Sequence, residues 1–408
     1  MEKAVPLKRS ISLPMLTLYG LGTIIGAGIF VLIGEVAGSA GIYAPVSFLL
    51  ASVIAGFTAF SYAELSSRFP KCAGEVVYLQ QAFHLQWLSL ATGCAIIITG
   101  IVSAATIANG SVGYLQEFVD LPPWLIITLL VTSLTMLACW GISESVGLAA
   151  ITTSIAITGL MVVIGINAEH LMTIPERLPE LLPAAEIETW RLITFGAFIA
   201  FYAFIGFEDM INIAEEVKNP RYNMPLGIIL ALVISTLLYV LIALVAVLAM
   251  PVEELAGSHA PLSALVNESQ QTVRMIITAV SVIAIADGAL VQIIKSARIL
   301  YGMSRQGMLP ALFSKVHPLR RVPLIATLAV AICILLIALA FPLLTLAKLT
   351  SFITLLVFAA INMALWWLKV RPDAKPAEGI NVPLWVPVCG FFVCLLFLLT
   401  QLMQEGVY

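Results

Sequence analysis

Long uninterrupted apolar runs dominate this chain, and eleven of them approach the ~20 residues that a helix needs to cross a bilayer. They cover residues 11–38, 43–67, 86–113, 123–141, 144–166, 191–214, 224–250, 271–302, 322–341, 344–368 and 382–404. The apolar residues are continuous and do not alternate with polar ones, which disfavours a β-barrel. We therefore predict an all-α integral membrane protein of about eleven spanning helices, forming one membrane domain over residues 1–408.

The composition supports this assignment. Of 408 residues, 61% are hydrophobic and 11% are charged, whereas soluble proteins have about 25% charged residues. The net charge of −3 gives no indication of nucleic-acid binding. The six cysteines lie mostly in the spans without metal-ligand spacing, so we expect packing roles for them, no metal site and no cofactor.

Basic residues indicate the orientation. If the N-terminus is cytoplasmic, 14 of the 20 Lys and Arg residues fall in cytoplasmic segments. We therefore predict a multi-pass protein with a cytoplasmic N-terminus. Short loops favour the plasma membrane of a bacterium or archaeon, which in bacteria is the inner membrane.

Two spans are interrupted. Four glycines lie within nine residues of the first span, from Gly20 to Gly28, and the sixth span contains Gly206 followed by Glu208 and Asp209. A glycine inside a helix costs about 1 kcal/mol relative to alanine, and an unpaired backbone group in lipid costs several kcal/mol. Such breaks persist where they are buried in protein or line a polar cavity, so both indicate a binding site. For the glycines of the first span, the alternative interpretation is that small residues permit close helix packing.

A broken helix offers two kinds of ligand group. Amides at the start of its second half suit a carboxylate, and carbonyls at the end of its first half suit an ammonium group or a cation. One site can therefore hold an α-amino acid zwitterion, and Gly26 and Gly28 let its atoms approach the backbone. Tyr202 is compatible with a lid or with packing. Glu208 is compatible with substrate contact, proton coupling or hydrogen bonds that hold the break.

The two breaks also suggest an internal repeat. The longest connection, residues 167–190, separates residues 11–166 from residues 191–368, and each part has five spans and begins with a broken one. Because five is odd, the second part has the opposite orientation in the membrane. We predict two inverted repeats and one additional helix at residues 382–404.

Three motifs resemble amino-acid permeases of the amino acid–polyamine–organocation (APC) superfamily. The sequence Gly22-Thr-Ile-Ile-Gly-Ala-Gly-Ile-Phe30 resembles their first-helix motif. Gly206-Phe-Glu208, followed by Glu215-Glu-Val-Lys-Asn-Pro220, resembles their sixth helix and the loop after it. Residues 296–307 are similar to the end of their eighth helix, and the resemblance spans about residues 10–370 in the same order.

The resemblance implies a fold of two inverted five-helix repeats and a specific substrate site. In such a site the substrate carboxylate would meet the amides around Ala27 and Gly28. Its ammonium group would meet the carbonyls of Ile24, Tyr202 and Ile205. Tyr202 occupies the place of an aromatic gate in related exchangers.

The chain departs from this family in the groups that couple transport to ions. Several proton-coupled relatives carry a lysine in the fifth helix where Ala156 stands here. Asp287 and Lys295 share roughly one face of the eighth span but lie about 12 Å apart along it, too far to pair directly. We hypothesise that Asp287 is a proton-linked group, or that Lys295 supplies the missing cation. A hydrogen-bonded structural role for Asp287 and a Lys295 that reaches the inner surface are the alternatives.

Together these features predict a secondary active transporter of amino acids that works by alternating access, coupled to a proton or to sodium. Gln292 lies at a position that resembles a gate in exchangers. The acidic residues Glu208, Asp209 and Asp287 would suit a cationic substrate. An amino acid or polyamine exchanger is therefore the main alternative. A non-transporting sensor is a weaker one. The chain has no Gly-x-x-x-x-Gly-Lys sequence and no His-Glu-x-x-His spacing, which disfavours ATP-driven transport and an enzyme. Neither the substrate side chain nor the oligomeric state follows from these patterns.

Overall fold

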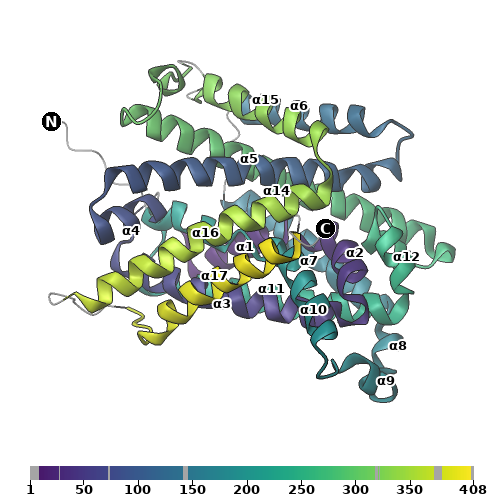
Figure 1. The fold of residues 1–408 in the computed structure, drawn as a ribbon. Coiled ribbons are helices and arrows are strands. Elements are labelled where there is room, and N and C mark those ends of the chain that lie inside the picture. The colour runs from purple at the N-terminus through teal and green to yellow at the C-terminus, as the bar shows by residue number, and fades with distance from the viewer. Residues whose placement is uncertain are drawn as a thin grey trace.

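The computed structural model describes residues 9–26, 28–71, 74–140, 146–317, 320, 322–371 and 379–405, and this part of the chain is helical (Figure 1). The α-helices are α1 (Leu13–Ile25), α2 (Gly28–Ala40), α3 (Ala44–Arg68), α4 (Gly74–Phe83), α5 (Gln86–Gln116), α6 (Pro123–Trp140), α7 (Val146–Ile166), α8 (Ala168–Leu171), α9 (Ile174–Leu181), α10 (Ile187–Phe201), α11 (Pro220–Ala249), α12 (Val252–Gly257), α13 (Pro261–Ala264), α14 (Gln271–Arg305), α15 (Leu324–Ala340), α16 (Leu343–Val370) and α17 (Trp385–Glu405). Short 3₁₀ helices are η1 (Gly41–Tyr43), η2 (Tyr202–Phe204), η3 (Phe207–Glu216), η4 (Glu268–Gln270) and η5 (Ala311–Ser314).

The helices agree with the predicted spans, and the prediction of an all-α membrane protein is confirmed. Nine continuous helical stretches of the described residues are long and apolar enough to cross a membrane, and α1 and α15 are shorter apolar helices. The predicted first span is divided into α1 and α2, and the sixth into α10, η2 and η3. The second half of the sixth span is a 3₁₀ helix, which the sequence did not indicate. The division into two inverted repeats stays a prediction.

Several helices have a proline in their first turn. Pro14, Pro45 and Pro220 lie in the first turns of α1, α3 and α11. Proline is favoured there because its fixed φ suits the helix. N–H groups of the first turn have no partner within the helix, so the N–H that proline lacks is not needed. These prolines fix where three of the helices start.

The helices pack in layers around the two breaks. α5 packs along both α14 and α16, and α6 and α15 cover α5 on its outer side (Figure 1). α1 packs on α7 and α11, while α2 packs on α10. Helix α4 lies at one end of the long helices, and α8, α9 and α12 lie at the other (Figure 1). The broken segments are therefore enclosed by α5, α7, α11 and α14.

A buried carboxylate anchors the additional helix α17. Glu64 of α3 is fully buried and accepts hydrogen bonds from Arg68 Nε at 2.9 Å and from the backbone N–H of Val382 at 2.8 Å. Lys369 Nζ of α16 lies 2.8 Å from the second carboxylate oxygen, Glu64 Oε2. Two cations offset the buried charge, as such a site requires. Because Val382 precedes α17, this arrangement ties that helix to α3 and α16.

Candidate functional site

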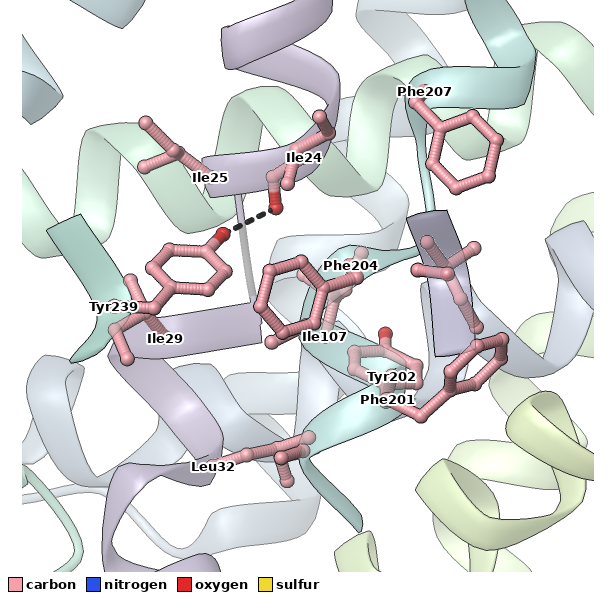
Figure 2. Packing of buried hydrophobic residues seen from close by; sticks show 14 of the residues in the cluster. Ile24, Ile25, Ile29, Leu32, Ile107, Phe201, Tyr202, Phe204, Phe207 and Tyr239 are labelled. Atoms are coloured by element: carbon pink, nitrogen blue, oxygen red, sulfur yellow. Dashed lines mark hydrogen bonds between the residues drawn. The ribbon is translucent and has the colours of Figure 1, made fainter. Parts of the chain in front are cut away.

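The first break leaves a backbone carbonyl that a neighbouring helix satisfies. α1 ends at Ile25, Gly26 follows in helical conformation with its N–H donating to the Gly22 carbonyl, and α2 starts at Gly28. The Tyr239 hydroxyl of α11 donates to the Ile24 carbonyl oxygen at 2.8 Å (Figure 2). Ala27, the predicted carboxylate-binding residue between the half-helices, lies outside the described residues.

The second break depends on a glycine conformation. Gly206 has φ of +134°, a region that side-chain-bearing residues rarely adopt. Glu208 Oε2 accepts a hydrogen bond from the Gly206 N–H at 2.8 Å. Of the three roles considered for Glu208, the structure therefore contains the hydrogen bond that holds the break.

The two breaks pack directly on one another. A Cβ atom on Gly28 would lie 2.2 Å from Ala203 Cα, and a Cβ atom on Gly206 would lie 2.3 Å from the Thr23 carbonyl oxygen. Both distances are far below van der Waals contact. Gly28 and Gly206 therefore have a packing role, which for the glycines of the first span was the alternative interpretation.

A small cavity of about 20 Å³ lies between the breaks. Its lining comes from four parts of the chain: Thr23, Ile24 and Gly28; Ser103 and Ile107 of α5; Tyr202 and Ile205; and Gly288, Val291 and Gln292 of α14. Five of the predicted substrate-binding residues thus surround one cavity: Ile24, Gly28, Tyr202, Ile205 and Gln292. Gly206 and Glu208 hold the break beside it, and a Cβ atom on Gly26 would lie 3.2 Å from Gly288 Cα. The volume is near that of one water molecule, so the cavity must widen to admit an amino acid.

Polar groups of this cavity differ in whether they have partners. The Tyr202 hydroxyl lies 3.0 Å from Ser103 Oγ. The Oε1 atom of Gln292 is buried and has no hydrogen-bond partner among the described residues. A buried acceptor left unsatisfied costs about 1–3 kcal/mol. Gln292 is therefore suited to accept a hydrogen bond from a ligand.

A larger cavity of about 740 Å³, which we call the vestibule, reaches the site from the end where α4 lies. Val291 lines both the vestibule and the central cavity. A separate cavity of about 200 Å³ lies toward the other end and is lined in part by Glu35, Asn109 and His259. The larger opening is therefore on the α4 side.

The two charged residues predicted in the eighth span have different partners. Asp287 Oδ2 accepts a hydrogen bond from Thr152 Oγ1 of α7 at 2.9 Å, one helical turn from Ala156. Lys295 Nζ lies 2.6 Å from Asp209 Oδ1, and the two side chains are only 9% and 3% exposed. Lys295 therefore pairs with a carboxylate inside the fold, which contradicts the alternative that its side chain extends to a membrane surface.

Two contacts at this site were not predicted from the sequence. Tyr239 was included only as part of an apolar span, although a tyrosine buried among apolar residues usually finds a partner for its hydroxyl. The pairing of Asp209 with Lys295 was also missed. Two opposite charges in apolar spans were the available signal, since a buried charge requires a partner.

Comparison with known proteins places the chain among membrane carriers. A family model described as amino acid permease matches residues 11–406. The chain is 31% identical to a methylthioribose transporter of Bacillus subtilis, covering 97% of this chain and 89% of that protein. It is 31% identical to a branched-chain amino acid permease of the same bacterium, covering 96% and 88%. It is also 31% identical to a vacuolar cationic amino acid transporter of Arabidopsis thaliana, where it covers 91% of this chain and 65% of the longer relative.

Proposed function

This chain belongs to the amino acid permease family, and we propose that it carries neutral α-amino acids across the plasma membrane by alternating access. The predicted family and the class of transporter, as opposed to enzyme, agree with these relatives.

The observation that carries this proposal is the cavity enclosed by both breaks and by α5 and α14. The N-terminal end of α2 begins at Gly28 beside it, and a helix N-terminus favours a carboxylate. The segment from Tyr202 to Ile205 provides backbone carbonyl groups for the substrate ammonium group. A zwitterion is thereby bound through the backbone, and the side chain of the substrate meets Ile107 and Val291.

The placement of the acidic residues favours a neutral substrate over a cationic one. None of the residues that line the central cavity is charged. Glu208 accepts from Gly206, Asp209 pairs with Lys295, and Asp287 accepts from Thr152. The branched-chain amino acid permeases among the relatives fit this preference better than the cationic amino acid transporters do. An exchanger of cationic amino acids or polyamines is the second candidate.

For coupling, we propose a proton bound at Asp287. This carboxyl group bonds Thr152 of α7, one helical turn from Ala156. Ala156 stands where the proton-coupled permeases that the chain resembles carry a lysine. A carboxylate within the bilayer is costly when ionised, so its protonation is linked readily to a change in the surrounding helices. With the N-terminus cytoplasmic, the vestibule opens to the cytoplasm and the described conformation faces inward.

Thermal stabilisation of the purified protein tests the substrate. The twenty amino acids and common diamines are compared at pH 5.5 and 7.5, with and without sodium, and hits are followed by uptake into liposomes. A ligand at 100 times its Kd adds about 2.7 kcal/mol to the free energy of unfolding. We expect aliphatic amino acids to stabilise. Stabilisation by diamines or lysine alone would favour the exchanger, and stabilisation without uptake would favour a sensor.

A further inference from the structure

Asp209, which lines the vestibule, has one buried carboxylate oxygen that no described residue satisfies. Asp209 is 2% exposed and lines this cavity. Its Oδ1 atom accepts from Lys295, but its buried Oδ2 atom has no hydrogen-bond partner among the described residues. A carboxylate oxygen left bare in a protein interior is costly and calls for a donor. The vestibule, at about 740 Å³, is large enough for a ligand that carries such a donor.

Two positively charged side chains also line the vestibule. Lys295 and Arg298 lie three residues apart on α14, so they are neighbours on one face of that helix. Both line the cavity, and the Arg298 side chain is exposed to it. Lys295 has three ammonium donors, of which one is used by Asp209. Donors for an anionic group therefore lie beside the free acceptor.

The charge balance selects the kind of ligand. The charged residues that line the described vestibule are Asp209, Glu216, Lys295 and Arg298, two of each sign. A simple cation at Asp209 Oδ2 would be repelled by the adjacent Lys295 ammonium group, and a simple anion at Arg298 by the carboxylates. A zwitterion brings both charges and matches both groups at once.

We propose that the vestibule holds a second, weaker binding site for an α-amino acid zwitterion, with its ammonium group on Asp209 Oδ2 and its carboxylate on Arg298 and Lys295. This site rests on the proposed function and extends it to the release path. Arg298 is seven residues from Val291, which lines the central cavity, so the second site lies about 10 Å along α14 from the first. A substrate leaving the central cavity therefore meets paired charges before it reaches water.

Equilibrium binding of tritiated L-leucine to the purified full chain, extended to millimolar concentration, tests the second site. We expect a tight and a weak phase. Arg298→Gln should weaken the weak phase about tenfold, the effect of a lost charged hydrogen bond, and leave the tight phase unchanged. Gln292→Leu, in the central cavity, should weaken the tight phase instead. Arg305→Gln is the matched control, because Arg305 is exposed on the same helix and donates to the Tyr301 hydroxyl outside the vestibule lining.

Two competitors define the chemistry of the weak phase. Isoamylamine lacks the carboxylate and 4-methylpentanoate lacks the ammonium group, so neither should displace leucine from it. Displacement by the amine alone would overturn the zwitterion assignment in favour of a cation site. A weak phase that survives both Arg298→Gln and Asp209→Asn, or one molecule of leucine bound per chain, would overturn the second site. Uptake into liposomes would still test the central site independently.

Discussion

Lys295 of α14 and Asp209 of η3 form a nearly buried ion pair with 2.6 Å between Nζ and Oδ1. The two residues are 86 positions apart in the chain. The pair joins the second half of the broken sixth span to the helix that lines both the central cavity and the vestibule. Its loss should therefore affect both the stability of the fold and the position of the break.

Replacing one member of this pair should be strongly destabilising. Lys295→Met leaves the Asp209 carboxylate buried without its cation, and breaking a buried pair in this way costs about 3–5 kcal/mol. Thermal unfolding in detergent measures the loss. The double variant Lys295→Leu/Asp209→Leu should recover most of it, because no unpaired charge remains.

Arg191→Gln provides the control for that experiment. Arg191 pairs with Glu188 on the exposed start of α10, and such a pair contributes about 0–1 kcal/mol. A Lys295→Met protein as stable as the Arg191→Gln protein would contradict the importance of the buried pair.

Tyr239→Phe removes the hydroxyl group that satisfies the Ile24 carbonyl at the first break. We expect a loss of about 1–3 kcal/mol in the free energy of unfolding, since a buried acceptor is left without its donor. Tyr222→Phe on the same helix is the control, because Tyr222 is 63% exposed. Equal unfolding temperatures for the two variants would show that the Ile24 carbonyl does not depend on Tyr239.

Gly206→Ala should damage the second break. The substitution forces a side chain into φ of +134° and places a Cβ atom 2.3 Å from the Thr23 carbonyl oxygen. Strain and overpacking of this kind each cost about 1–3 kcal/mol. The control is Gly165→Ala in α7, where a Cβ atom would meet nothing within 4 Å. Liposome uptake and unfolding temperature should both fall for Gly206→Ala, and normal uptake by this variant would disprove the strained break.

Stability should depend on pH through Glu75 of α4. Burial raises the pKa of this carboxyl group from 4.5 to about 7, opposed by nearby Lys295 and a hydrogen bond from Tyr62 and aided by Asp209. Below pH 4.5 the group is protonated in folded and unfolded chains alike. Between pH 4.5 and 7 the unfolded chain ionises while the folded chain keeps its proton, so stability falls, by about 3 kcal/mol at most, and it levels off above pH 7.

The variant Glu75→Gln isolates this effect. It should flatten the decline in unfolding temperature between pH 5 and pH 8, whereas Glu253→Gln, at an exposed position of α12, should keep it. A decline that is equally steep in Glu75→Gln would assign the pH dependence to other groups.

Asp287→Asn tests the proposed proton coupling. Asparagine imitates the protonated carboxyl group and can still bond Thr152, so the fold should persist. We expect uptake into liposomes to lose its dependence on the pH gradient while exchange of internal for external substrate continues. Asp120→Asn, exposed in the connection before α6, is the control. An unchanged pH profile would rule out Asp287 as the coupling group.

The sequence was informative where local composition determines structure. Apolar runs of membrane-spanning length predict helices because the bilayer leaves the backbone few alternatives. The glycines near Gly28 and Gly206 marked both breaks, since each is poorly suited to a continuous helix. Contacts between distant positions were harder to predict. Tyr239 and Ile24 are 215 residues apart, and no periodicity within either helix relates them.

The charged residues show the same limit. Asp287 and Lys295 were recognised as unusual because lipid disfavours charge, and their spacing correctly excluded a direct pair. Their partners, Thr152 and Asp209, depend on how α7 and η3 pack against α14, which is a property of the assembled fold.

The mutual packing of the breaks has a consequence for how selectivity can diversify. Gly28 lies on Ala203 and Gly206 lies on Thr23, so neither backbone segment can be remodelled without displacing the other. The part of the cavity formed by these two backbone segments, which we propose binds the invariant end of an amino acid, is thereby fixed. Residues on the surrounding walls, such as Ile107 on α5 and Val291 on α14, are free of that constraint. Changes of substrate in engineered descendants of this chain should accumulate on those walls and spare the glycines.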